Sequence, residues 1–284
     1  MIFKKLVLVL LLSTVLSVSN VAQKKNVVYV VMEGLSRSTF YTLLQKDKLP
    51  AVKAAIASGN YRNAFLEQVP TANDEAALQL YTGVHLSQSE LVTKNFALDR
   101  SIYMKLLMED PELSIGFFLT KPLKRDYDAL LDYYLNEHLT YFHDDELRYQ
   151  TTVQVGEGFA NFVRQSEGRF FAVINFTNAD YVASRYREGT QLYSQAAQNC
   201  DRALMSGIKA LKEKGLLEST EFFIVTNVGY DYQLPYRNEK IWMASSRKIM
   251  RKGKQYDVFP SLLDLLGLSD SALSQSLSGT SLFK

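Results

Sequence analysis

Short, unbroken hydrophobic runs recur along the chain, separated by longer segments in which apolar residues have helical spacing. Residues 26–32 (NVVYVVM) are apolar and rich in β-branched side chains, which is typical of a strand buried on both faces of a parallel sheet. The same pattern predicts strands at residues 112–120, 168–177 and 220–227, and a weaker strand at 240–246. These runs predict the strands of one buried sheet.

Helices are predicted between these strands. Residues 49–60 close with a Gly-Asn pair, and residues 194–217 gather apolar side chains on one face. Residues 259–268 carry a proline near their start and a glycine at their end, which are typical helix boundary residues. Strands that alternate with helices predict an α/β fold with a mostly parallel central sheet and helices on both faces. In such a sheet, functional side chains gather where strands end and helices begin.

The first 22 residues differ from the rest of the chain. Lys4 and Lys5 precede a short apolar run, and small residues follow up to Ala22, which predicts a signal peptide cleaved after Ala22. The alternative is a membrane anchor, but the apolar run is shorter than the roughly 20 residues needed to span a bilayer. We therefore expect a secreted or periplasmic protein with no transmembrane span in the mature chain, and one domain over residues 23–284.

Charge and cysteine content narrow the classes of partner. Removal of Lys4 and Lys5 takes the formal net charge from +2 to about 0, so no long-range attraction to nucleic acid is expected. Cys200 is the only cysteine, so the chain can form no internal disulfide. Its place on the apolar face of a predicted helix favours a core residue over a nucleophile.

Residues 121–160 interrupt the alternation of strands and helices. They are rich in Tyr, Asp and Leu, and we interpret them as helical or irregular material that forms a small cap over the edge of the sheet. His138 and His143 lie here, next to Asp144 and Asp145, which is a conceivable metal cluster. The interpretation we favour is a polar, solvated surface segment.

Polar residues follow several of the predicted strands directly. Because the carboxyl ends of parallel strands meet at one edge, we expect these residues to lie close together. They are Glu33-Gly34 after residues 26–32, Asp180 and Ser184 within FTNADYVASR (176–185), and Asn227-Val228 within VTNVGYD (225–231).

Residues 70–83 (PTANDEAALQLYTG) have the frame of a nucleophile loop, with a Pro-Thr turn at one end and Thr-Gly at the other. Asn73 lies three residues after Pro70 and nine before Thr82, so this loop carries an amide where such a frame would hold an attacking hydroxyl.

These motifs, in this order and with a closing Pro-Ser-Leu-Leu helix and Gly-Thr-Ser-Leu segment, resemble the alkaline phosphatase superfamily. That family includes phosphodiesterases, nucleotide pyrophosphatases and sulfatases. The resemblance covers residues 26–284, with 121–160 covered only loosely. It implies a site with two metal ions that activate a nucleophile and stabilise the leaving oxygen. It also implies that the nucleophile position is Asn73.

The residues at the implied ligand positions are a poor match for two metal ions. One implied site keeps Asp180, but its histidine position is Ser184, and no histidine follows His143. Zinc requires about four donors of the thiolate, imidazole or carboxylate type. Two zinc ions are therefore not expected.

The other implied site holds Glu33, Asn73, Asn227 and Val228. Asn73 cannot ionise and so cannot act as a nucleophile, and Val228 offers no donor atom. One carboxylate and two amides are compatible only with weakly bound Mg²⁺ or Ca²⁺. No cofactor is otherwise expected.

The sequence therefore predicts an exported, alkaline-phosphatase-like protein with a dismantled two-metal site, acting as a non-catalytic binding or scaffold protein. Its partner would be a small phosphorylated or sulfated ligand or an envelope protein. One alternative is a phosphoester or sulfoester hydrolase with a rebuilt metal site, and another is a structural partner in an envelope assembly. The candidate ligand-pocket residues are Glu33, Asn73, Asp74, Asn178, Asp180, Asn227 and Asp231.

Overall fold

The computed structural model describes residues 25–57, 59–65, 102–120, 141–143, 151–227, 229–230, 237–238, 240–275, 277 and 279–284. The predicted signal peptide lies outside these ranges. So do four candidate site residues, which are Asn73, Asp74, Val228 and Asp231.

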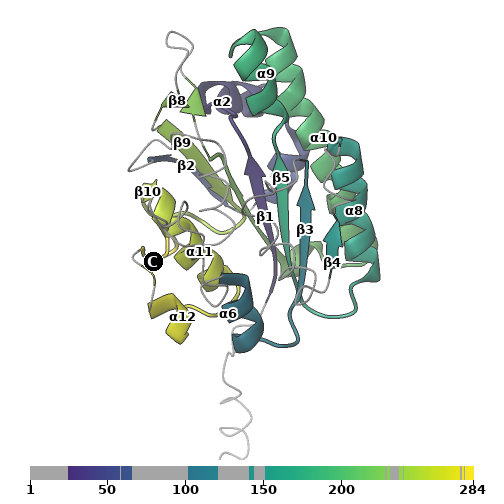
Figure 1. Ribbon diagram of the computed structural model, residues 1–284, viewed down its shortest axis with the longest axis vertical. Helices are drawn as coiled ribbons and strands as arrows, with labels where there is room; N and C mark the ends of the chain where they lie inside the picture. The colour runs from purple at the N-terminus through teal and green to yellow at the C-terminus, as the bar shows by residue number, and fades with distance from the viewer. Residues whose placement is uncertain are drawn as a thin grey trace, which may run out of the picture.

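An eight-stranded sheet in the order β10-β2-β9-β6-β1-β5-β3-β4 forms the centre of the molecule (Figure 1). Strand β9 pairs antiparallel with both β2 and β6, and the other pairs in the sheet are parallel. The expected mostly parallel sheet is therefore confirmed. The strands are β1 (Asn26–Met32), β2 (Asn60–Phe65), β3 (Ser114–Leu119), β4 (Tyr141–His143), β5 (Phe170–Phe176), β6 (Thr220–Val225), β9 (Lys240–Ser245) and β10 (Gly253–Lys254), while β7 (Gly229–Tyr230) and β8 (Arg237–Asn238) pair separately.

Helices cover both faces of the sheet, as expected from the alternating pattern. One face is covered by α2 (Arg37–Gln45), α3 (Pro50–Ala55), α8 (Thr152–Gln165), α9 (Asn178–Tyr186) and α10 (Gln191–Glu213). The other is covered by α6 (Ile102–Glu109) and α11 (Val258–Leu265), with α12 (Ala272–Gln275) beside α6. Short 3₁₀ turns, η2 (Leu217–Ser219) and η3 (Gln255–Asp257), precede β6 and α11.

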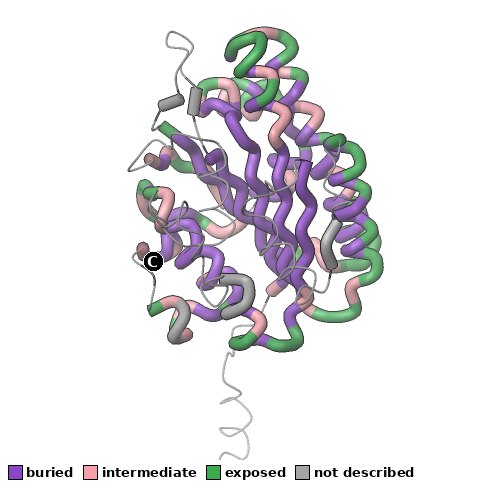
Figure 2. The backbone as a smooth tube through the Cα atoms, viewed as in Figure 1, coloured by how far each residue is buried: buried purple, intermediate pink, exposed green. Residues whose placement is uncertain are grey.

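Strand β1 shows why the continuous apolar runs become central strands. All seven of its residues are buried, because successive side chains point to opposite faces and both faces are covered. Val27, Tyr29 and Val31 join the core on the α11 side, and the alternate residues join the core on the α10 side. Figure 2 shows the same burial along the neighbouring central strands.

The prediction of a single helix over residues 49–60 is wrong at its carboxyl end. Helix α3 ends at Ala55, and residues 60–65 (NYRNAF) form β2 instead. This strand is largely polar and only partly buried, so it lacks the apolar run by which the other strands were recognised. The position of β2 in the sheet is determined by its pairing with β9 on one side and β10 on the other.

Part of the segment interpreted as a cap belongs to the main fold. Residues 141–143 form β4, which pairs with β3 at the edge of the sheet. Residues 152–165 form α8, whose Phe159 and Val163 are buried in the core on the α10 side. A cap built from residues 121–140 and 144–150 stays a prediction, because these residues lie outside the described ranges.

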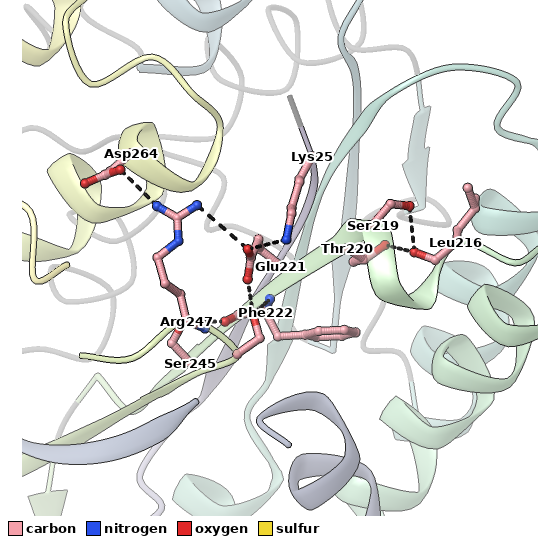
Figure 3. A network of polar contacts seen from close by, with 10 residues as sticks. Lys25, Leu216, Ser219, Thr220, Glu221, Phe222, Ser245, Arg247 and Asp264 are labelled. Atoms are coloured by element: carbon pink, nitrogen blue, oxygen red, sulfur yellow. Dashed lines mark hydrogen bonds and ion pairs between the residues drawn. The ribbon is translucent and has the colours of Figure 1, made fainter. Parts of the chain in front are cut away.

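A charged network holds the amino edge of the sheet together (Figure 3). Glu221 of β6 accepts a hydrogen bond from Lys25 at 2.9 Å and another from the Ser246 hydroxyl, and Arg247 lies 3.7 Å away. Burial raises the pKa of Glu221, but these hydrogen bonds and positive charges outweigh it, so the pKa lies below its ordinary value. Arg247 also reaches Asp264 of α11 at 3.0 Å. The network therefore joins the sheet to α11.

Candidate functional site

Three strands, β5, β1 and β6, end at the edge opposite this network, and their ends bring polar side chains together. In the register, Met32 of β1 pairs with Phe176 of β5, and Val31 of β1 pairs with Val225 of β6. The carboxyl ends of the three strands are therefore aligned. The next polar residues therefore meet at one place. We call Glu33, Asn175, Asp180 and Asn227, which surround Gly34, the strand-end site.

Gly34 makes the close approach at the centre of this site possible. Its φ is +66°, a conformation that residues with a Cβ adopt reluctantly. A Cβ on Gly34 would lie 2.6 Å from the Cα of Asp180. The Asp180 N–H also donates to the Glu33 carbonyl at 3.0 Å. The structure therefore brings Glu33 and Asp180 together, across a glycine that leaves room for them.

The carboxylate of Glu33 is bound by a side chain that sequence reasoning missed. Asn175 donates its amide N–H to Glu33 Oε1 at 2.7 Å, and both side chains are buried. The signal for Asn175 was a single amide inside the otherwise apolar strand FFAVINF. A buried amide in such a run requires a hydrogen-bond partner.

The orientation of the Asn227 amide is fixed by its neighbour. The Gly34 N–H donates to Asn227 Oδ1 at 3.1 Å, so the oxygen faces Gly34 and the NH₂ group faces away. That nitrogen, Nδ2, is buried and has no hydrogen-bond partner within the described part of the chain, while the whole residue is 1% exposed. Asn227 therefore presents hydrogen-bond donors, and its acceptor is already used.

The loop after β1 is held by contacts with β5, β9 and α10. The Glu33 N–H donates to Phe176 of β5, and the Leu35 carbonyl accepts from the indole of Trp242 at 2.7 Å. The Tyr193 hydroxyl donates to the Gly34 carbonyl at 2.6 Å. The same hydroxyl accepts from the Ser36 N–H at 2.7 Å. This loop is therefore a rigid base for the site.

Two threonines tie the neighbouring strand end to the site, and they too were missed in the sequence. The Thr177 N–H donates to Thr120 Oγ1 at 2.8 Å, and the two hydroxyl oxygens lie 3.0 Å apart. Asn178 follows as the first residue of α9 and is half-buried.

Ser184 does not share the environment of Asp180. It lies on the exposed side of α9, and its hydroxyl donates to the Tyr181 carbonyl at 2.9 Å. The described contacts therefore turn it back onto its own helix.

Cys200 lies in the core, as its place on an apolar helix face predicted. It is buried on α10, and burial raises the pKa of its thiol well above the ordinary value. A thiol that does not ionise is not a nucleophile.

Asp201, the next residue, has a structural contact. Its carboxylate accepts from the N–H groups of Ala51 and Val52 at 3.1 and 2.8 Å, at the start of α3. It is 1% exposed. Burial raises its pKa to about 6, although the two N–H groups act in the opposite direction.

We predict that Asp201→Asn flattens the pH dependence of stability between about pH 4 and 6. A carboxyl whose pKa is raised in the folded state from 3.8 to about 6 contributes stability at low pH. That contribution is lost as the pH rises through this window. Urea melts of the unmodified chain and of Asp201→Asn from pH 3.5 to 7.5 measure the free energy of unfolding at each pH. If the two plots of this free energy against pH are parallel, the prediction is wrong.

The described donors do not fit the two metal ions that the resemblance implies. Asn175 places an N–H group against Glu33, and Asn227 turns its N–H groups away from Gly34, whereas a metal ion binds lone pairs. Among the residues that the structure describes, no group of three or more His, Cys, Asp or Glu could hold a metal ion. Within the same residues, no helix is long and apolar enough to span a bilayer.

Comparison with known proteins identifies the fold. No protein-family model and no curated protein sequence matches the chain. The lipoteichoic acid synthase LtaP from Listeria monocytogenes matches with a TM-score of 0.63 at 15% identity, over 92% of this chain and 75% of that one. A protein in the alkaline phosphatase superfamily from Vibrio parahaemolyticus matches with a TM-score of 0.55 at 15% identity, over 87% and 67%.

The C-terminal periplasmic domain of EcEptC from Escherichia coli matches with a TM-score of 0.59 at 12% identity, over 86% of this chain and 82% of that one. The chain therefore has the fold of the alkaline phosphatase superfamily, as the order of its motifs suggested. Identities this low show the fold alone.

Proposed function

We propose that this chain is an exported, non-catalytic binding protein that uses the strand-end site to hold a ligand without cleaving it. The observation that carries the proposal is the orientation of Asn227, whose buried NH₂ group has no partner among the residues that the structure describes. A donor in this position favours a ligand oxygen and disfavours a metal cation.

The pairing of Glu33 with Asn175 supports the same conclusion. The carboxylate oxygen Oε1 is occupied by an amide N–H at 2.7 Å, so it is less able to bind a metal ion. A hydrolase of the expected kind needs a metal to activate its nucleophile, and the residue at the predicted nucleophile position is Asn73. The expected ligand is a small phosphorylated or sulfated compound, because its oxygens accept hydrogen bonds.

Export is part of this proposal. The predicted signal peptide over residues 1–22 supports it, and two of the similar structures are a lipoteichoic acid synthase and a periplasmic domain. Action as a structural partner in an envelope assembly stays a prediction, which co-purification with envelope proteins would test.

One observation favours a second candidate function, a hydrolase with a rebuilt metal site. The backbones of Glu33 and Asp180 meet at Gly34, and a pair of carboxylates that face one ion is a common part of a Mg²⁺ or Ca²⁺ site. Together with Asp231 they would hold the ion, and water would attack the ester.

We predict that the mature chain hydrolyses none of p-nitrophenyl phosphate, bis-p-nitrophenyl phosphate and p-nitrophenyl sulfate, with or without Mg²⁺, Ca²⁺, Mn²⁺ or Zn²⁺. We also predict that a panel of phosphorylated and sulfated compounds contains one that raises the melting temperature. A ligand at about 100 times its Kd adds about 2.7 kcal/mol to the free energy of unfolding. Metal-dependent turnover that Glu33→Gln abolishes would establish the second candidate instead.

Asn227→Asp is the variant that tests the role of the amide in binding. It keeps the acceptor for the Gly34 N–H but replaces the NH₂ group with a charged oxygen, so we expect the ligand-induced shift to disappear. Asn161→Asp is the matched control, because Asn161 is exposed on α8 and its oxygen already accepts from Arg164. Equal shifts in the two variants would rule out recognition through Asn227.

A further inference from the structure

A second polar cluster lies beside the loop after β1 and is not part of the strand-end site. Glu188 follows α9, and its side chain reaches the start of α2. It is only 6% exposed. The residue before it, Arg187, has a φ of +67°. We call Glu188, Ser36, Ser38 and Thr39 the Glu188 cluster.

The two carboxylate oxygens of Glu188 have very different surroundings. Oε1 accepts from the Ser36 hydroxyl, from the Ser38 hydroxyl at 2.7 Å and from the Thr39 hydroxyl at 3.4 Å. Oε2 is buried and has no hydrogen-bond partner in the described ranges. Among the described residues, no Lys, Arg or His forms an ion pair with it.

A buried carboxylate oxygen without a partner is unfavourable, because it has lost its water and gained nothing in return. The start of α2 compensates part of the negative charge, since the N–H groups of a first helical turn attract anions. Only Oε1 receives hydrogen bonds there, so the lone pairs of the buried Oε2 are left uncompensated. A positively charged partner would.

We propose that the Glu188 cluster is a binding site for a hard metal cation of the calcium type. All its donor atoms are oxygens, from one carboxylate and three hydroxyl groups, and it contains no nitrogen or sulfur donor of the kind that zinc prefers. Ser36 Oγ and Ser38 Oγ lie 3.2 Å apart, close enough for both oxygens to face one ion. Hydroxyl hydrogens can rotate, so the same oxygens can turn their lone pairs toward an ion.

The surroundings of Oε2 also limit the size of the ligand. The atom has almost no accessible surface, so a single ion fits better than a polyatomic group. Calcium accepts six to eight oxygens in flexible geometry and completes its shell with water, whereas magnesium requires near-octahedral geometry at shorter distances. With one carboxylate, the Kd for calcium is expected to be about 10⁻⁴–10⁻³ M, a range found in extracellular modules.

This ion would stabilise the fold and would take no part in ligand binding at the strand-end site. It would hold the segment after α9 against the start of α2. The Ser36 N–H already bonds to Tyr193, whose hydroxyl bonds to Gly34, so the two sites are neighbours but use different carboxylates. The calcium site at the Glu188 cluster is therefore independent of ligand binding at the strand-end site, and each can be tested without the other.

The experiment is a calcium titration of the mature chain after EDTA treatment, with isothermal calorimetry and thermal melts at constant ionic strength. We expect one site with a Kd of about 10⁻⁴–10⁻³ M and a melting temperature that rises with CaCl₂. The same concentration of MgCl₂ should raise it less, and NaCl should not raise it at all. Glu188→Gln, which keeps the shape but removes the charge, should weaken calcium binding at least tenfold.

Two further variants assign the ion to its site. Glu213→Gln removes an exposed carboxylate near the end of α10, and its calcium response should equal that of the unmodified chain. Glu33→Gln should also leave the response unchanged, because Glu33 belongs to the strand-end site. Loss of calcium binding in Glu33→Gln but not in Glu188→Gln would overturn the inference and place the ion at the strand-end site. A melting temperature that does not depend on calcium would mean that only water meets Oε2, which would also overturn it.

Discussion

Replacing Trp242 with alanine is expected to lower the free energy of unfolding by about 3–5 kcal/mol, the usual range for a large aromatic residue removed from a core. Trp242 of β9 is fully buried. Its ring stacks on Phe40 of α2 with the centroids 3.6 Å apart and the planes 3° from parallel. Its indole N–H also satisfies the Leu35 carbonyl. The substitution therefore leaves both a cavity and a buried carbonyl without its partner.

Urea melts followed by far-UV circular dichroism measure this effect, since Trp242 is the only tryptophan and its fluorescence is lost in the variant. Trp242→Phe separates the two contributions, because it keeps a ring against Phe40 but removes the N–H donor. Met250→Ala is the control, because Met250 is exposed and its loss should change stability by no more than about 0.5 kcal/mol. A loss below about 1 kcal/mol in Trp242→Ala would contradict the packing described for the loop after β1.

Gly34→Ala is expected to have the second largest effect, a loss of about 2–5 kcal/mol from left-handed strain and overpacking combined. The new Cβ would lie 2.6 Å from the Cα of Asp180 and 2.9 Å from its backbone nitrogen. Because these are backbone atoms, α9 itself must move to relieve the contact. Such a shift separates Asp180 from Glu33 and disturbs the strand-end site.

Gly215 provides a matched control within the same chain. Its φ is +67°, nearly equal to that of Gly34, but a Cβ there would meet nothing within 4 Å. Gly215→Ala should therefore lose only the strain contribution, about 1–2 kcal/mol. The difference between the two variants, measured in the same urea melts, gives the contribution of the contact with Asp180. If Gly34→Ala and Gly215→Ala lose the same free energy of unfolding, α9 can move away from the new Cβ without a loss of stability. Gly34 would then be needed only for its positive φ.

These predictions bear on the function because the same loop carries the candidate site. Trp242, Tyr193 and Asn227 each bond to a different backbone group of residues 34–36. A rigid loop keeps the Asn227 amide in one orientation, with its oxygen toward Gly34 and its NH₂ group away from it. The ligand-binding role proposed above depends on that orientation.

Much of the fold was determined by the local sequence. The strands β1, β5 and β6 lie where continuous apolar runs predicted them, because a strand covered on both faces must be apolar on both sides. Their order of alternation with helices predicted the α/β class. Strand β2 was missed for the opposite reason, since it is polar and only partly buried, and its pairing with β9 and β10 cannot be read from residues 60–65 alone.

The sequence by itself also determined that acidic residues follow the strands, and that Glu33 and Asp180 would meet if those strands were parallel neighbours. Only the tertiary structure decided what these groups bond to. Asn175 reaches Glu33 over 142 positions of the chain, and the carboxylate of Glu188 reaches Ser36 over 152. Such contacts depend on strand register and on the direction in which each side chain leaves the backbone. Local patterns of polar and apolar residues carry information about burial, but they do not specify which donor will face which acceptor.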